Sequence, residues 1–343
     1  MSATATAIRK KLEDSHLRDV GDGFWECGFR ALGSACELFY SAPDRAAAEN
    51  YRAAALDWLA AFEAQFSRFI SDSLITRIND NAGVEWTGID AQTELLLDLC
   101  DHHHFVTQGA FDATSLPLSE LWDWKRKHDK LPDEAEISAA KSRVGWKRIQ
   151  RAPGRIFLPE QGMKLDFGGV GKEFAVDCLA QLATGHGIEH IMVDLGGDIA
   201  VRGEPPEGGG WYVGLENPMH EGRSYCGIRL KSGGAVATSG DYRRCFQHEG
   251  RTYGHIIDCR TGWPVANGTR SVSVIATRCT MAGLLATSAM IIGGTDAITM
   301  LERTPGVQGC LWRNDQHYET RGFRRCVLPQ GWDEELVLSP CTS

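Results

Sequence analysis

The stretch KLDFGGVGKEF, residues 164–174, carries an apolar run into a glycine turn and then into a helical pattern. Glycines allow backbone N–H groups to approach an oxyanion closely, and the N-terminus of a following helix adds a favourable field. We expect a helix to begin at Lys172, because apolar residues recur from Phe174 to Leu182 at helical spacing. The stretch therefore predicts a strand, a tight turn and a helix, in the order found at many phosphate-binding sites.

Neither common phosphate-binding motif fits this turn. A Walker A loop requires Ser or Thr after its Gly-Lys pair, but Lys172 is followed by Glu173, and Asp166 stands where the first glycine is required. The dinucleotide fingerprint G-x-G-x-x-G fails as well, because Phe174 replaces its last glycine. Asp166 and Glu173 would repel a bare phosphate, which favours a bridging metal or contacts to ring nitrogens and hydroxyls. Alternatively, the stretch is a strand-to-helix turn that is capped by acids and binds no ligand.

Composition bounds the class of protein. The chain has 343 residues, of which 43% are hydrophobic and 24% charged, so it can bury a sizeable core in one large or two modest domains. Its formal net charge of −9 argues against a general nucleic-acid or anionic-membrane binder, because both need surplus Lys and Arg. We therefore expect no nucleic-acid partner.

Cysteine usage and the N-terminus bear on the compartment. Eleven cysteines are scattered along the chain without a Cys-x-x-Cys pair, which favours free thiols in a reducing compartment over a zinc site or a disulfide framework. The N-terminal residues meet charges at once and lack the apolar segment of a signal peptide. No apolar run reaches the roughly 18 residues that a membrane span needs. We expect a cytoplasmic protein without membrane insertion.

The remaining periodicity predicts a mixture of helices and short strands. Residues 1–22 are polar and are expected to form a flexible arm, ahead of one domain over residues 23–343. This order of elements favours an α+β fold, with two lobes that share one cleft. Helices are expected over 44–69, 90–106, 172–184 and 282–292, and strands or hairpins over 27–40, 148–167, 190–203, 211–216, 233–240 and 271–277.

Eight blocks in a fixed order carry more information than any one of them. They are GSACELFY (33–40), FSRFISDSLITRIND (66–80), GAFDATSLPLSELWDW (109–124), MKLDFGGVGKEFAVD (163–177), IMVDLGGDIAVRG (191–203), AVATSGDYRR (235–244), HIIDCRTGWPV (255–265) and SVSVIATRCTMAGLLATSAMIIGG (271–294). This series resembles the ApbE-type flavin transferases, enzymes that move FMN from FAD onto a threonine of a target protein. The resemblance covers about residues 28–300.

The resemblance implies a fold, an activity and a set of site residues. The implied fold is α+β and T-fold-related, with mixed sheets and packed helices in two lobes around an FAD cleft. The implied activity is that of an FAD:protein FMN transferase, which uses Mg²⁺, releases AMP and needs an acceptor flavoprotein with a threonine. The implied contacts are Phe69, Ala110, Phe111, Asp112, Asp166, Lys172 and Ile257 for FAD, Gly169, Ala286 and Thr287 for the metal, and His255 and Asp258 for the transfer step.

Each of these residues also has a simpler interpretation. Phe69 and Phe111 are equally typical of a hydrophobic core, and Asp112 and Asp258 are typical of turn caps. The run of three histidines at residues 102–104 suggests a metal cluster, but three consecutive side chains cannot all face one ion. We expect these histidines to lie on the solvated surface.

One departure from the family pattern concerns the metal. The family's last block reads A-D-A-L-A-T-A, in which the Asp and the Thr bind the metal, and this chain keeps Thr287 but has Gly283 at the acidic position. Loss of a carboxylate should weaken Mg²⁺ binding. Asp194, which lies close to Asp198, is a candidate replacement. Two other functions therefore stay open: an FAD-binding protein that has lost transfer, and an FAD pyrophosphatase that uses water as the acceptor.

Overall fold

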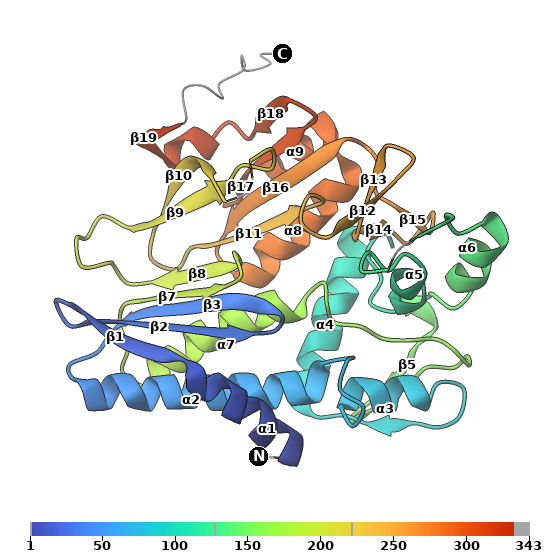
Figure 1. Cartoon of the computed structure of the whole chain (residues 1–343), viewed down its shortest axis with the longest axis horizontal. Coiled ribbons are helices and arrows are strands. Elements are labelled where there is room, and N and C mark those ends of the chain that lie inside the picture. Colours follow the sequence, from blue (N-terminus) through green and yellow to red (C-terminus); the bar gives the residue numbers. More distant parts are fainter. Residues whose placement is uncertain (1, 127, 221, 333–343) are drawn as a thin grey trace.

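A computed structural model describes residues 2–126, 128–220 and 222–332 of the chain (Figure 1). Its centre is a nine-stranded sheet in which all neighbouring strands are antiparallel. The strands come from both halves of the chain, so the two halves share one sheet. In spatial order they are β1 (His16–Gly21), β2 (Phe24–Ala31), β3 (Ser34–Ser41), β7 (Ile191–Leu195), β8 (Ile199–Arg202), β11 (Ala235–Gly240), β16 (Thr269–Ala276), β17 (Gln308–Arg313) and β18 (Gln316–Glu319).

The strands bury both faces of the central sheet. In β11, Ala235 and Ala237 pack into a core with the helices, while Val236 packs into a second core on the opposite face. β16 shows the same alternation, with Val272 and Val274 on the helical side and Ile275 on the other. Successive side chains of a strand point to opposite faces, so such apolar runs need cover on both sides.

Three long helices cover one face: α2 (Arg45–Phe66), α7 (Gly171–Gly185) and α8 (Cys279–Ile292), which lie along the sheet in Figure 1. Asp44 caps α2 by accepting a hydrogen bond from the Ala47 amide at 2.8 Å. α7 packs against β7 and β8, and α8 packs against β11, β16 and α7. α9 (Gly294–Glu302) follows α8 and packs against β17. The contact between α7 and α8 matters most for the site described below.

A small sheet covers the opposite face. It contains β9 (Trp211–Glu216), β10 (Ser224–Leu230) and β19 (Val327–Trp332). Trp211 and Ile228 of this sheet share a core with Trp312 of β17.

The remaining elements gather at one end of the central sheet, on the right of Figure 1. Their core joins Leu118 and Trp122 to Ile137 and Ile257, and the Trp122 indole donates a hydrogen bond to the Gly262 carbonyl at 2.8 Å. The elements are α3 (Leu74–Asp80), α4 (Ala91–Val106), α5 (Leu116–Leu121), α6 (Glu134–Lys141), β4 (Thr87–Gly88), β5 (Gln150–Ala152), β6 (Arg155–Phe157), β12 (Cys245–His248), β13 (Arg251–Gly254), β14 (Ile257–Asp258) and β15 (Trp263–Pro264).

Most of the predicted elements are present, and the α+β class is confirmed. The helix expected over 90–106 begins at Ala91 behind its cap Asp90. The strand expected over 27–40 is a hairpin of β2 and β3, because Leu32 and Gly33 adopt positive φ angles and reverse the chain. Residues 190–203 likewise form the β7–β8 hairpin.

The prediction of a flexible arm over residues 1–22 is wrong. α1 (Ala3–Lys11) packs against α2, the 3₁₀ turn Leu12–Asp14 follows, and β1 forms the edge of the central sheet. Ala5 and Leu12 are buried, and the Arg9 guanidinium pairs with Asp57 at 2.6 Å. These few apolar contacts are enough to hold α1 against α2, because the polar residues of α1 face solvent on its other side.

Two further features concern thiols and membranes. Every cysteine that the structure describes is a free thiol, as expected from their spacing. Within the described residues, no helix combines the length and apolar character needed to cross a bilayer.

Candidate active site

The glycine turn lies where α7 begins, one residue before the predicted start. The Gly171 amide donates to the Phe167 carbonyl at 2.7 Å, which closes the turn, and the Asp166 amide donates to the Ala113 carbonyl at 2.8 Å. A Cβ atom on Gly169 would lie 2.8 Å from Cε2 of Phe111, so only glycine lets the Phe111 ring pack this closely on the backbone. The turn and the segment 109–112 are therefore in contact, although they are distant in the sequence.

Asp166 and Phe69 are linked through Arg68. The Arg68 guanidinium lies 3.3 Å from the Asp166 carboxylate and 4.4 Å from the centre of the Phe69 ring. Burial raises the pKa of Asp166, which Arg68 and the Gly168 amide partly offset. Phe69 is 74% exposed, so the alternative that it is a core residue is wrong. The Lys125 ammonium lies 5.3 Å from the same ring centre, so the exposed ring is surrounded by positive charge.

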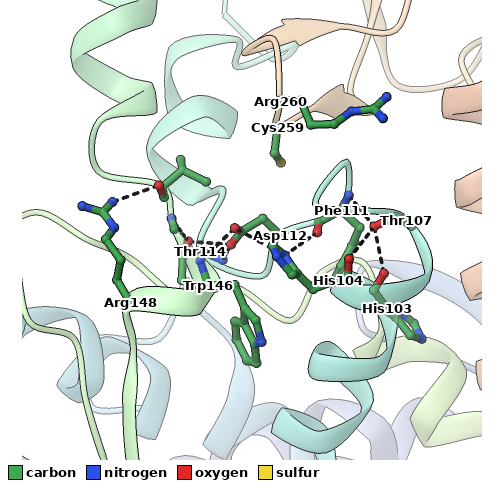
Figure 2. A network of polar contacts seen from close by, with 12 residues as sticks. His103, His104, Thr107, Phe111, Asp112, Thr114, Trp146, Arg148, Cys259 and Arg260 are labelled. Atoms are coloured by element: carbon green, nitrogen blue, oxygen red, sulfur yellow. Dashed lines mark hydrogen bonds and ion pairs between the residues drawn. The ribbon is translucent and has the colours of Figure 1, made fainter.

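The segment 109–112 is held by several hydrogen bonds, of which Figure 2 shows those of Phe111 and Asp112. The Ala110 carbonyl accepts from the Cys259 amide at 3.1 Å, which ties this segment to the one that contains Ile257 and Asp258. The two carboxylate oxygens of buried Asp112 accept from Thr114 and from the Trp146 amide at distances of 2.6–2.9 Å. The interpretation of Asp112 as a turn cap is thereby confirmed, and its carboxylate acts by shaping the loop.

The three histidines differ in environment, and the prediction that all are solvated is wrong. His102 is exposed, but His103 faces the inside of α4 and is only 2% exposed. Burial, with a smaller contribution from His102, lowers the pKa of His103 to about 3. The Nδ1 atom of His104 lies 3.2 Å from the Phe111 carbonyl oxygen. Figure 2 shows the imidazole turned toward that carbonyl. The helical period places consecutive residues 100° apart, so three neighbours sample three environments.

Lys172 reaches from the first turn of α7 to Asp198, which directly precedes β8. The two side chains form an ion pair, and Asp198 is 5% exposed. Burial alone would lower the pKa of Lys172, but the carboxylates of Asp198 and Glu173 outweigh it and raise that pKa. Asp194, the candidate replacement acid, instead accepts from the Gly197 amide at 2.7 Å and closes the β7–β8 turn.

His255 and Asp258 lie on the segment that Cys259 anchors. The His255 Nδ1 atom is buried and has no hydrogen-bond partner among the described residues. Burial first, and then the positive charges of Arg244 and Lys172, lower the pKa of His255 to about 4. Asp258 pairs with Arg260 at 2.7 Å and accepts from its amide at 3.0 Å, which is the arrangement of a turn cap.

The predicted metal residues offer few side-chain oxygens. The Thr287 hydroxyl lies 3.0 Å from that of Ser239, whereas Ala286 is fully buried within α8 and has no side-chain ligand atom. Among the described residues, no cluster of three or more His, Cys, Asp or Glu side chains is arranged to hold a metal ion. Mg²⁺ does not need such a cluster, because one carboxylate, water and phosphate oxygens often suffice.

Glu173 was missed as a site residue by the sequence interpretation. Its side chain lies directly over Gly283 of α8, so that a Cβ atom on Gly283 would be 2.5 Å from Oε1 of Glu173. Burial, together with the charge of Asp198, raises the pKa of Glu173. The sequence did contain a signal for it: Glu173 directly follows the glycine turn, and Gly283 stands where the family pattern has an Asp. The Glu173 carboxylate, like the Gly169 carbonyl and the Thr287 hydroxyl, offers oxygen of the kind that Mg²⁺ prefers as a ligand.

The fold and this cluster of residues define a class: an α+β protein with one long antiparallel sheet, whose glycine turn opens a helix beside a buried lysine–aspartate pair. The chain belongs to the ApbE family, whose model matches residues 32–311.

Known relatives and solved structures agree with this assignment. The chain is 31% identical over 240 residues to an FAD:protein FMN transferase of Vibrio cholerae serotype O1, covering 69% of this chain and 72% of the relative. It is 30% identical over 282 residues to one of Salmonella typhimurium, covering 80% and 77%. The ApbE protein from Thermotoga maritima superposes with a TM-score of 0.79 at 30% identity, over 88% of this chain and 99% of that one. A histidine-to-glycine mutant of the flavin transferase ApbE from Vibrio cholerae gives 0.78 at 26% identity, with the same coverage.

Proposed function

We propose that this protein is an FAD:protein FMN transferase that moves FMN from FAD to a threonine hydroxyl of an acceptor flavoprotein and releases AMP. The observation that carries the proposal is the meeting of three distant segments, in which Phe111 packs on Gly169 and the Ala110 carbonyl binds the Cys259 amide. Family membership and relatives that carry this activity support it.

The residues around the turn would bind the dinucleotide. Phe69 offers an exposed ring for stacking on a flavin or adenine ring, and Arg68 beside it offers a positive charge. Lys172 remains protonated next to Asp198 and can balance the charge of a pyrophosphate. Asp166 faces ring nitrogens or hydroxyls rather than phosphate, because its carboxylate would repel an anion.

His255 is proposed as the group that accepts the threonine proton. Transfer forms a bond between the threonine oxygen and the FMN-side phosphorus and breaks the bond to the AMP oxygen, while the hydroxyl proton must leave. A neutral imidazole can take that proton, and the Nδ1 atom of His255 is free of protein partners among the described residues. Asp258, paired with Arg260, positions this segment.

Mg²⁺ is proposed as the metal of the reaction. When bound, it supplies charge stabilisation to the pyrophosphate oxygens as the phosphorus is transferred. The Gly169 carbonyl and the Thr287 hydroxyl would hold it. The free thiols of the chain support a reducing compartment, and we place the protein in the cytoplasm on that basis.

The proposal is tested with the purified full chain, FAD, Mg²⁺ and a flavoprotein domain that bears an acceptor threonine. We expect covalent flavin fluorescence on the acceptor in a denaturing gel and an equal amount of released AMP. An acceptor whose threonine is replaced by alanine is the control. Free FMN without labelled acceptor would instead indicate a pyrophosphatase, and FAD binding without AMP release would indicate a binding protein.

The role of His255 gives a sharper prediction. We expect His255→Asn to lower the rate of transfer by about 100-fold or more, because general-base catalysis contributes roughly that factor, while FAD affinity changes little. Single-turnover transfer and FAD fluorescence titration measure the two quantities separately. Equal losses in both would contradict the assignment of His255 as the proton acceptor.

A further inference from the structure

Glu173 and Gly283 form a complementary pair across the contact between α7 and α8. Glu173 lies in the first turn of α7, and its side chain covers the backbone of Gly283 in α8. A Cβ atom on Gly283 would lie 2.5 Å from Oε1 and 2.6 Å from Cγ of Glu173, closer than side-chain atoms can approach. The volume that an acidic side chain on Gly283 would need is therefore already filled by the carboxylate of Glu173.

This carboxylate contacts the helix that carries Thr287 and follows the turn that carries Gly169. Gly283 and Thr287 are four residues apart in α8, so they lie on the same face of the helix, one turn from each other. Gly169 belongs to the turn that leads into the first turn of α7, where Glu173 lies. Glu173 thus contacts the face of α8 that carries Thr287, and it does so from the helical turn that directly follows Gly169.

The neighbouring acids are already engaged. Asp198 pairs with Lys172, Asp194 closes the β7–β8 turn, and Asp177 accepts from backbone amides at the start of α8. By contrast, no other residue that the structure describes donates a hydrogen bond to the Glu173 carboxylate. The Glu173 carboxylate lies against α8 with its own backbone amide as its hydrogen-bond donor, so most of its oxygen lone pairs remain available to a cation.

We propose that Glu173 on α7 is the carboxylate ligand of the divalent cation in this protein, replacing an acid on α8. The inference rests on the proposed function, since it takes Mg²⁺ as the metal. Mg²⁺ binds through one or two carboxylates together with phosphate oxygens and water, so one glutamate in this place meets its needs. Moving the acid from α8 to α7 keeps a negative charge at the same point of the site.

The test measures metal binding rather than transfer. Mn²⁺, used as a probe for Mg²⁺, is titrated into the full chain saturated with FAD, and free Mn²⁺ is followed by electron paramagnetic resonance. We expect Glu173→Gln, which keeps the shape of the side chain, to weaken Mn²⁺ binding by at least about tenfold, as expected when a metal site loses an anionic ligand. Glu134→Gln is the matched control, because Glu134 is an exposed glutamate in the first turn of α6.

A double variant tests the exchange of the acid between the helices. Glu173→Ala removes the atoms that crowd position 283, so Glu173→Ala combined with Gly283→Asp should recover Mn²⁺ affinity to within about threefold of the wild type. Gly283→Asp alone should not improve binding, because the two side chains compete for one volume. A double variant that binds Mn²⁺ as weakly as Glu173→Gln contradicts the proposal.

Further readouts separate this inference from misfolding and from the proposed function. FAD affinity in the presence of EDTA and the melting temperature should be the same for Glu173→Gln and the wild type. Wild-type Mn²⁺ affinity in Glu173→Gln overturns the inference. A chain that binds Mn²⁺ through Glu173 but labels no acceptor would leave the inference standing and overturn the proposed function instead.

Discussion

Lys172 and Asp198 form a partly buried ion pair directly after the glycine turn. The apolar spacing predicts that Lys172 opens a helix, and the family resemblance implies that it contacts FAD. Its partner could not be predicted from local pattern, since Asp198 belongs to the distant β7–β8 hairpin and reaches α7 only through the packing of the sheet. The contact of Arg68 with Asp166, which connects Phe69 to the glycine turn, could not be predicted from local pattern either.

We expect Lys172→Met to destabilise the protein by about 3 kcal/mol, because it leaves the buried Asp198 carboxylate without its cation. FAD affinity should fall as well. Urea unfolding and FAD fluorescence titration measure the two effects. Lys172→Met combined with Asp198→Asn should recover much of the stability but not the FAD affinity.

Lys164→Met provides the control for that variant. Lys164 pairs with Glu120 at 2.7 Å, and the two side chains are 36% and 42% exposed, more than those of the buried pair, so this change should cost at most about 1 kcal/mol. Equal losses in the free energy of unfolding from the two lysine variants would contradict the prediction that the Lys172–Asp198 pair stabilises the protein more.

At the scale of elements, some helices are capped at their N-terminus by the preceding residue, and others by a residue that is distant in the sequence. Asp44 and Asp90 cap α2 and α4 from the residue directly before each helix, and the sequence identified Asp90 for that reason. α8 has no side-chain cap of its own at Arg278. Asp177 of α7 takes that role by accepting from the amides of Cys279 and Thr280 at 2.8 and 3.1 Å.

Asp177 should therefore stabilise α8 as an N-cap does. We expect Asp177→Ala to lower the free energy of unfolding by about 1–2 kcal/mol, because two amides and the hydroxyl of Thr280 lose their acceptor. Asp98→Ala, which removes an exposed partner of Arg151, should change it by less than about 1 kcal/mol. Urea unfolding of both variants decides whether α7 caps α8 as described.

At the scale of the whole molecule, the central sheet joins both halves of the chain and leaves α1 and β1 at its edge. The α+β class and most elements follow from periodicity, because side chains that repeat every two or 3.6 residues report burial on one face. The N-terminal segment was misjudged because its polar composition hides a narrow apolar stripe that α2 covers. His103 was misjudged for a related reason, since the side of α4 that faces the core is set by its neighbours.

Burial of His103 predicts that acid destabilises the protein. The pKa of His103 is lowered to about 3 by burial, so below pH 6.5 the unfolded state takes up a proton that the folded state does not. The free energy of unfolding is unaffected by protonation of this residue above pH 6.5 and falls as the pH drops toward 3. The loss amounts to about 3 kcal/mol at pH 4.5. Urea unfolding between pH 7 and 4.5 should show a shallower pH dependence for His103→Asn than for the wild type. An unchanged pH dependence in His103→Asn would contradict this prediction.

The sequence by itself determined the features that depend on neighbours within a few residues. These are the glycine turn before α7, the cap at Asp90, the alternation of the buried strands and the ordered blocks that mark the family. Local backbone preference and side-chain periodicity are sufficient to specify them. Only the tertiary structure decided which distant side chains meet: Asp198 at Lys172, Asp177 at the start of α8, and Glu173 over Gly283. Such contacts are set by how two helices pack on one sheet, and this packing places the acid of α7 where the glycine of α8 leaves room.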